Sequence, residues 1–435
     1  MKRKLRKVFY ALRHAPTVPF YGFIQGHSTL TGGQLRNAGR LVGIDDTELV
    51  KAFEAEFANQ AGGSDAVSFA AARMAFFALM KALDIGVGDE IILQGATCAV
   101  MVTAILRTGA KPVFSDIDPQ TFGSSASSIA RCITPRTRMI VAQHSFGIPC
   151  DIEPITSLAK SAGVFLLEDC ALTLGSKWAG IPVGQFGDAA LFSTDHSKPL
   201  NTIIGGLVMA KDQALTFRLR QIQTEAGSLS AAKQEALWSR VLFQRKFCPP
   251  SRYGSVAIRD ILGRLTAGDK ESPFLLQDFS IHQSSRYSYP ARMPAFLAAV
   301  GMAELGRWRE TIVERKALLK ALLSAAEKSP VGPHIPRIYY DPKADIVPLR
   351  FAWFQENGNV MRERISHVID TDWTWFMEPI VGAQTELNDY FYYPGSCPQA
   401  ERIGPNMINI PCTIPSPFAD DLVSHCKLSW GETLR

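Results

Sequence analysis

Helical and strand patterns alternate along the chain between about residues 67 and 212, and this alternation limits the fold more than any other feature. Within it, residues 164–167 form a continuous apolar run, which is typical of a strand buried on both faces of a parallel sheet. Further strands are predicted at 89–93, 111–116, 189–193 and 206–210, and helices at 71–83, 97–108 and 151–162. Strands that alternate with helices favour an α/β fold with a mostly parallel central sheet.

The composition fits a soluble globular enzyme of two or three domains. The chain has 435 residues, of which 46% are hydrophobic and 20% charged. Its net charge of +5 is too small to indicate a nucleic-acid partner. The 8 cysteines are scattered without CxxC pairs, which favours reduced thiols in a cytoplasmic protein over a disulfide framework or a zinc site. No bound metal is therefore expected.

The amino-terminal segment is basic and amphipathic. No acidic residue precedes Asp45, and apolar residues follow a helical spacing among the basic ones. Such a segment can lie on an anionic membrane surface. The favoured alternative is a helix that packs on its own protein or on a second subunit. The segment lacks the apolar core of a secretory signal, and the chain has no apolar run long enough for a spanning helix. The basic residues in question are Lys2, Arg3, Lys4, Arg6 and Lys7.

An acid and a lysine stand out within the alternating region. Asp169 follows the apolar run of the predicted buried strand, and the carboxyl end of such a strand is where open α/β sheets bind ligands. Lys198 lies further along, on a polar turn after the predicted strand 189–193. Pyridoxal phosphate (PLP) needs such a pair, because a lysine holds it as a Schiff base and an acid keeps its pyridine nitrogen protonated. Taken alone, Asp169 is better explained as a helix N-cap and Lys198 as a solvated surface residue.

The surroundings of Lys198 suit a phosphate group. Ser193 ends the preceding predicted strand, and further hydroxyl side chains lie between it and the lysine. After the lysine, Gly205 and Gly206 permit a close backbone approach before the next strand.

Several of these motifs together resemble one family. Gly187-Asp-Ala-Ala-Leu-Phe-Ser193, followed by Lys198-Pro-Leu and by Gly205-Gly206, resembles the DegT/StrS family of sugar aminotransferases, which are fold-type I PLP enzymes. The segments 88–90, 109–118, 144–149 and 292–301 resemble that family as well. The resemblance covers residues 45 to 212 strongly and the rest of the chain weakly. It implies a large domain with a mostly parallel sheet between helices and a smaller α+β domain at the carboxyl end.

With this resemblance the chain divides into three parts. Residues 1–44 are the basic amino-terminal segment, and residues 45–285 are the large PLP-binding domain. Within the large domain, residues 213–283 are predicted as polar helices that form an insertion or a connection. Residues 286–435 are the small carboxyl-terminal domain, which a long helix from Met293 opens.

The resemblance implies a role for each cofactor-binding position. Lys198 is the Schiff-base lysine, Asp169 the partner of the pyridine nitrogen, and Ser193 a ligand of the cofactor phosphate. Ala72 and Arg73 stand where the family has a Gly-Thr phosphate loop, at the start of a helix. Backbone N–H groups and the helix dipole can bind phosphate there without those side chains. Arg73 either adds a charged contact to the phosphate or is a surface residue.

Three positions depart from the family pattern. Cys98 stands where the family places an aromatic residue over the cofactor ring, and Leu172 where it often has glutamine. Pro290 stands where a neighbouring subunit supplies an asparagine to the phosphate. These changes weaken ring stacking and polar contacts, but they leave Lys198 and Asp169 in place. PLP binding is therefore still expected.

Two further groups are candidates for substrate contacts. His196 precedes Lys198 by two positions and is either a substrate-contacting residue or a structural turn residue. Trp373, Trp375 and Phe376 cluster near Glu378. They form either a wall on which a sugar stacks or, as the favoured interpretation, a packed corner of the core.

The resemblance implies a PLP-dependent aminotransferase that moves an amino group from an amino acid, such as glutamate, to a keto-sugar. The sugar is expected to be nucleotide-linked, in surface-polysaccharide or secondary-metabolite biosynthesis, and the enzyme a homodimer with active sites at its interface. One alternative is another PLP reaction, such as sugar dehydration or amination of a non-sugar ketone. The other is a degenerate, non-catalytic relative that binds a ligand or a partner.

Overall fold

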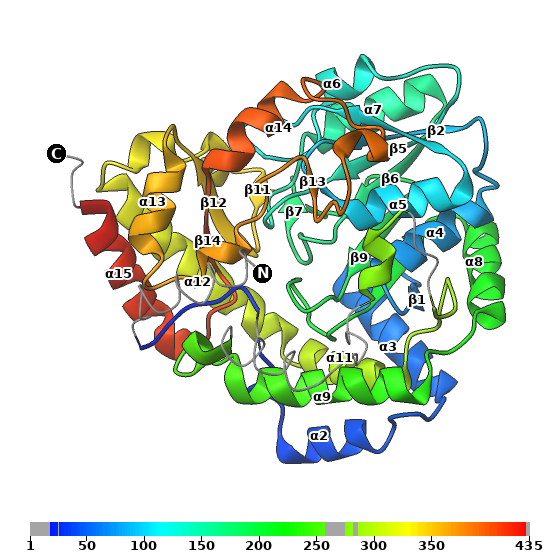
Figure 1. Ribbon diagram of the computed structural model, residues 1–435, viewed down its shortest axis with the longest axis horizontal. Helices are drawn as coiled ribbons and strands as arrows, with labels where there is room; N and C mark the ends of the chain where they lie inside the picture. Colours follow the sequence, from blue (N-terminus) through cyan, green and yellow to red (C-terminus); the bar gives the residue numbers. More distant parts are fainter. Residues whose placement is uncertain (1–17, 25, 257–274, 282–285, 432–435) are drawn as a thin grey trace.

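A seven-stranded sheet forms the centre of the computed structural model, which describes residues 18–24, 26–256, 275–281 and 286–431 (Figure 1). The strand order is β1-β10-β9-β6-β5-β2-β4. Strand β10 runs antiparallel to both neighbours, and the remaining neighbours are parallel. The predicted α/β fold with a mostly parallel sheet is thus confirmed. The strands are β1 (Val67–Phe69), β2 (Glu90–Gln94), β4 (Lys111–Ser115), β5 (Thr137–Gln143), β6 (Phe165–Asp169), β9 (Ala189–Ser193) and β10 (Gly206–Ala210).

The pairing register collects the ends of several strands at one edge of the sheet. Because β10 is antiparallel, its first residue, Gly206, lies opposite the last residues of its neighbours, Phe69 and Ser193. One strand further, Asp169 ends β6 and lies opposite Gln143, the last residue of β5. This edge therefore carries the residues that the sequence singled out.

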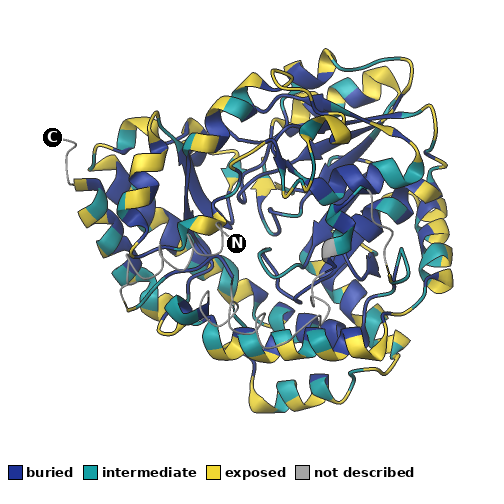
Figure 2. Ribbon diagram, viewed as in Figure 1, coloured by how far each residue is buried: buried dark blue, intermediate teal, exposed yellow. Residues whose placement is uncertain are grey.

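Apolar side chains cover both faces of the central strands. In β2, Ile91 belongs to the larger hydrophobic core and Ile92 to a separate cluster. In β6, Leu167 belongs to the larger core and Leu166 to the separate cluster. Successive side chains of a strand point to opposite faces, so each face has its own core. Strands buried on both faces explain the continuous apolar run in β6 (Figure 2).

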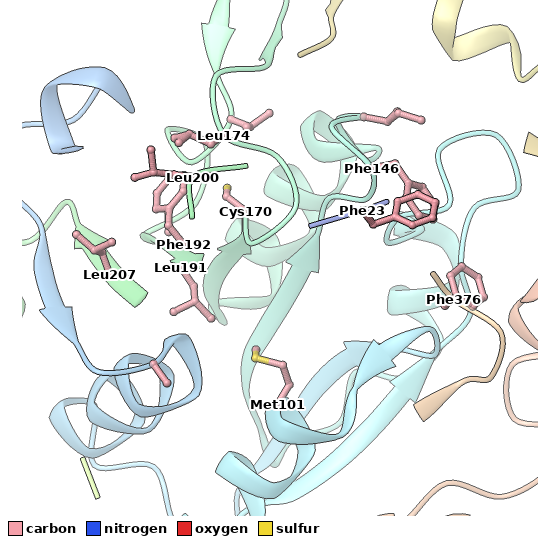
Figure 3. Packing of buried hydrophobic residues seen from close by; sticks show 14 of the residues in the cluster. Phe23, Met101, Phe146, Cys170, Leu174, Leu191, Phe192, Leu200, Leu207 and Phe376 are labelled. Atoms are coloured by element: carbon pink, nitrogen blue, oxygen red, sulfur yellow. The ribbon is translucent and has the colours of Figure 1, made fainter. Parts of the chain in front are cut away.

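Helices pack on these faces. Helix α4 (Ala72–Ala82) packs on β9 and β10, and α7 (Ile152–Ala162) packs on β5 and β6. The larger core joins side chains of α5 (Ala99–Thr108), β9 and β10, as Figure 3 shows for Met101, Phe192 and Leu207. The short helix α6 (Ala126–Ala130) packs beside α7.

A second group of elements follows the central sheet in sequence (Figure 1). Strands β12 (Arg350–Phe354) and β14 (Met407–Pro411) pair antiparallel. The helix predicted from Met293 through Leu305 is α11, which begins at Ala295 and ends at Leu305, and a second helix follows after a turn at Gly306 and Arg307. The helices of this part are α11 (Ala295–Leu305), α12 (Trp308–Glu327), α13 (Gly358–Ile365), α14 (Pro398–Ile403) and α15 (Ala419–Gly431).

Short strands connect distant parts of the chain. Strand β11 (Ala344–Asp345) pairs with β7 (Lys177–Trp178), which also pairs with β8 (Ile181–Pro182). Strand β13 (Ile380–Val381) pairs in parallel with β3 (Thr97–Cys98). The carboxyl-terminal part thus reaches the start of α5.

The remaining helices lie before and after the sheet in sequence. Helices α2 (Gly32–Gly39) and α3 (Thr47–Gln60) both contact α11. Helices α8 (Gln213–Glu225) and α9 (Ala231–Phe247) fall in the region predicted as polar helices. The basic segment at 1–13 and part of that helical region lie outside the described residues. Among the helices that the structure describes, none is long and apolar enough to cross a bilayer.

Candidate active site

Asp169 lies at the carboxyl end of β6, and its side chain is buried, with 4% of the residue exposed. Its Oδ1 accepts a hydrogen bond from the Ala171 N–H at 3.0 Å. Turns follow β6, so the interpretation of Asp169 as a helix N-cap is wrong. Burial raises the pKa of the Asp169 carboxyl, while that hydrogen bond and the charges of Lys198 and His144 oppose the shift. The carboxylate is therefore held in a desolvated position that favours a cationic partner.

Lys198 lies on the turn between β9 and β10 and is partly buried. Its backbone N–H donates to the Asp195 carbonyl at 2.9 Å, and its Nζ lies 5.5 Å from the centroid of the Trp375 ring. The lysine is thus not a fully solvated surface residue. Its charge acts on Asp169, Asp195 and Cys98, which places all of these groups around one region.

The start of β10 brings Ser193 next to the start of α4. Gly206 lies opposite Ser193, and a Cβ atom at Gly206 would stand 2.1 Å from the Ala72 Cα. Only glycine permits this contact. Helix α4 has Ala71 as its N-cap, with no side-chain hydrogen bond to the cap. Uncapped N–H groups beside the Ser193 hydroxyl are a suitable cradle for a phosphate group.

Arg73 is buried at the same helix start, so the interpretation of Arg73 as a surface residue is wrong. Its Nε donates to Asp278 Oδ2 at 2.5 Å, and its Nη2 donates to the Leu275 carbonyl at 3.0 Å. Burial alone would lower the pKa of Arg73, but the Asp278 carboxylate outweighs it and raises that pKa. A contact of Arg73 with the phosphate remains a prediction, and the carboxylate of Asp278 would then share the guanidinium with it.

The positions that depart from the family pattern lie around the same region. Cys98 is the N-cap of α5, and burial raises the pKa of its thiol against the charges of Lys198 and Arg73. Leu172 is buried in the turn after β6. The segment with Pro290 passes its own helix α4: the Tyr289 hydroxyl donates to the Arg73 carbonyl at 3.3 Å.

The His196 ring lies against the Asp195 carboxylate beside Lys198. Its Nδ1 lies 2.9 Å from Asp195 Oδ1, and its ring packs edge-on against Trp373 with 5.7 Å between centroids. Burial by itself would raise the pKa of Asp195, but His196, Lys198 and Arg73 outweigh it and lower that pKa to about 2. Sequence reasoning missed Asp195, although its position next to His196 on the lysine turn was a signal for it.

The aromatic cluster divides between the core and the candidate site. Phe376 is fully buried, as the packed-corner interpretation expects. Trp373 is 42% exposed and contacts His196, and the Trp375 ring faces Lys198. A packed core corner therefore describes Phe376 but not the two tryptophans.

Comparison with known proteins identifies the family. A model of the DegT/DnrJ/EryC1/StrS aminotransferase family matches residues 42–416. The chain belongs to this family. The resemblance that the sequence motifs showed is thus confirmed, and it extends across nearly the whole chain.

Relatives within the family are named as sugar aminotransferases. The chain is 40% identical to GDP-perosamine synthase of Escherichia coli O157:H7 over 39% of this chain and 46% of that one. It is 36% identical to the UDP-N-acetyl-3-dehydro-alpha-D-glucosamine 3-aminotransferase of Acidithiobacillus ferrooxidans over 41% and 50%. The aligned part therefore spans about half the length of these curated relatives. In fold, the chain is similar to DesV of S. venezuelae, with a TM-score of 0.71, 23% identity and coverage of 97% and 100%.

Family membership implies pyridoxal phosphate as the cofactor, and the residues present fit it. Asp169 offers a desolvated carboxylate to a protonated pyridine nitrogen. The Ser193 hydroxyl and the start of α4 offer donors to the phosphate. Lys198 would offer its amine, whose charge acts on the Asp169 carboxyl.

A buried hydrogen-bond network supports the end of β6 behind Asp169. The carboxylate of Glu168 accepts backbone N–H groups of Gly184, Phe186 and Gly187 at 2.6–2.8 Å and contacts His144 Nε2 at 3.2 Å. His144 Nδ1 accepts the Cys150 N–H at 3.0 Å. Glu168, His144 and the nearby Cys170 have metal-ligand side chains, but these bonds already occupy the carboxylate and the imidazole. We therefore interpret the network as structural support for the strand that carries Asp169.

Replacing Glu168 with alanine is expected to lower the free energy of unfolding by on the order of 3 kcal/mol or more, because buried N–H donors lose their acceptor. Urea unfolding followed by circular dichroism measures this change. Glu153→Ala, on the exposed side of α7, is the matched control and should change stability little. Equal stability of the two variants would show that the network does not support the strand.

Proposed function

We propose that the protein is a PLP-dependent aminotransferase that transfers an amino group from an amino acid to a keto-sugar. One observation carries the proposal: Lys198, Asp169 and Ser193 lie around one edge of the sheet, beside the start of α4, in a chain that belongs to an aminotransferase family. Open α/β sheets bind their ligands at this edge. The site therefore has an amine, an acid and a phosphate cradle in one place.

Each residue of the site has a separate role in the proposed reaction. Bound PLP supplies an electron sink for the pair of electrons released when a C–H bond next to nitrogen breaks. Lys198 would hold the cofactor through Nζ and would move a proton at the reacting carbon. Asp169 holds a proton on the pyridine nitrogen by its charge, and Ser193 with the α4 N–H groups orients the phosphate. His196, which lies against Asp195 near Lys198, is the proposed substrate-contacting residue.

The proposed acceptor is a nucleotide-linked keto-sugar, and the proposed donor is glutamate. Support for the acceptor comes from the relatives, whose names refer to GDP- and UDP-linked sugars. The proposed pathway is the biosynthesis of a surface polysaccharide or a secondary-metabolite sugar. The exposed indole of Trp373 near His196 offers a flat apolar surface of the kind on which a sugar ring packs.

Purified protein reconstituted with PLP tests the proposal. We expect a visible absorbance band that glutamate shifts, followed by 2-oxoglutarate release and amination of one member of a panel of GDP-, UDP- and dTDP-linked keto-sugars. Conversion of a sugar without any amino donor would indicate a dehydratase instead. Amination only of keto compounds without a nucleotide would limit the substrate class. Protein that stays colourless with excess PLP would indicate a non-catalytic relative and sink the proposal.

A homodimer in the cytoplasm is the proposed state of the enzyme, with small-molecule substrates as its partners and no nucleic acid. This assembly follows from the resemblance to the family, whose active sites lie at a subunit interface. Sedimentation of the PLP-loaded protein at micromolar concentration would measure the oligomeric state.

For the basic segment at 1–13, packing on protein is the favoured proposal and membrane contact the alternative. We expect the full chain to stay unbound when it is sedimented with anionic vesicles at low salt, because the apolar face of the segment is then covered. Binding that disappears on deletion of residues 1–13, with PLP binding unchanged, would instead establish a peripheral membrane contact. Neutral vesicles are the control, since electrostatic attraction requires anionic lipid.

A further inference from the structure

Trp375 brings an aromatic ring from the carboxyl-terminal part of the chain to the reactive lysine. The Lys198 Nζ lies 5.5 Å from the centroid of the Trp375 ring. A few residues further on, β13 pairs with β3, where Val381 lies opposite Cys98. The segment from Trp373 to Val381 therefore runs from the lysine turn to the start of α5, along the candidate site.

Buried groups hold Trp375 in this place. Its backbone N–H donates to Asn409 Oδ1 at 2.9 Å. Arg350 Nη1 donates to the same oxygen at 3.0 Å and to the Trp373 carbonyl at 2.6 Å. Arg350 begins β12 and Asn409 lies in β14, and both are buried. Two paired strands thus fix the position of the tryptophan, which a surface loop would not do.

The polar edge of the indole points to a ligand as well. The Trp375 Nε1 is buried, and it has no hydrogen-bond acceptor among the residues that the structure describes. Buried indole N–H groups normally have an acceptor. A ligand with an oxygen or phosphate atom beside Lys198 would supply one.

We propose that Trp375 covers the pyridine ring of the cofactor and so supplies the aromatic contact that Cys98 does not. The inference rests on the proposed function, because it requires PLP at Lys198. A protonated pyridine ring is flat and cationic, and tryptophan is the side chain whose face attracts a cation most strongly. The cofactor rather than the sugar is the assigned occupant, since the atom under the indole is the lysine nitrogen that bonds the cofactor.

A PLP titration of four variants tests this role. In Trp375→Leu the dissociation constant of PLP should rise about three- to tenfold, because an aromatic contact is lost. Trp375→Phe should retain most of the affinity, and Cys98→Phe combined with Trp375→Leu should regain it. Trp373→Leu, in the same segment, should leave the dissociation constant unchanged.

Energy transfer gives a readout that does not depend on activity or on the fold of the leucine variant. Excitation of tryptophan in wild-type protein should produce emission from bound PLP, and Trp375→Phe should lose the largest part of it. Trp178→Phe, in the short strand β7, is the control and should keep this emission.

The outcomes separate the inference from the proposed function. Wild-type protein that forms no absorbance band dependent on Lys198 would overturn the proposed function. Wild-type protein that binds PLP, with an unchanged dissociation constant in Trp375→Leu and unchanged transfer in Trp375→Phe, would overturn this inference alone. In Trp375→Leu, an unchanged dissociation constant of PLP together with a higher KM for the keto-sugar would mean that the indole contacts the sugar. That result would also overturn this inference.

Discussion

Replacing Lys198 with alanine is expected to abolish the absorbance band of the lysine-bound cofactor and to lower kcat for keto-sugar amination by about 10²–10⁴-fold or more. The physical reason is that one amine performs two tasks. Under the proposed function it would hold the cofactor covalently at rest, and it would move a proton at the reacting carbon. Among the residues that the structure describes, Lys198 is a lysine whose charge acts on both Asp169 and Asp195. Absorbance titration with PLP and steady-state kinetics with glutamate measure the two losses separately.

The Lys198→Ala variant should still fold. Lys198 is partly exposed, so its truncation should change the free energy of unfolding by about 1 kcal/mol or less. Lys211→Ala, an exposed lysine just after β10, is the matched control and should keep the band and the turnover. Retention of the band in Lys198→Ala would mean that another lysine binds the cofactor, and the assignment of the site would be wrong.

The sequence predicted those parts of the fold that local patterns determine. The run at 164–167 was expected to be a strand buried on both faces, and β6 is one. Strand β5 was not among the predicted strands, although it lies in the middle of the sheet between β2 and β6. Its first residues, Thr137 and Arg138, are polar, and its burial comes from neighbours distant in sequence. The helix expected from residue 97 begins at Ala99, because β13 draws Thr97 and Cys98 into a strand pair.

The candidate site, too, could be predicted where local patterns determine it but not where distant residues meet. Asp169 and Ser193 end neighbouring strands, and a general rule for α/β sheets places such residues together. The partner of Arg73 could not be predicted, because Asp278 lies 205 positions away in sequence. Nor did the sequence indicate which ring of the aromatic cluster would reach Lys198. Periodicity reports which face of an element is buried, but it does not report which distant side chain covers that face.

Replacing Asp169 with asparagine is expected to lower kcat by on the order of 10²–10³-fold and to weaken PLP binding, while the protein stays folded. Asparagine has nearly the same shape, and its side-chain oxygen can still accept the Ala171 N–H. Only the negative charge is lost, so the pyridine nitrogen would no longer be held protonated. Because burial already disfavours that charge, stability should not fall. Asp188→Asn is a control with the same change at the other edge of the sheet.

The pH dependence of PLP affinity provides a sharper test of Asp169 than its rate effect. Burial raises the pKa of this carboxyl, and the pyridine cation of the proposed function would bind its charged form. Below that pKa the carboxyl must lose a proton before it can pair, so wild-type affinity should fall as the pH falls through it. Asp169→Asn has no such group and should lack this fall, whereas Asp188→Asn should keep it. Identical pH profiles for wild type and Asp169→Asn would show that Asp169 does not face the pyridine nitrogen.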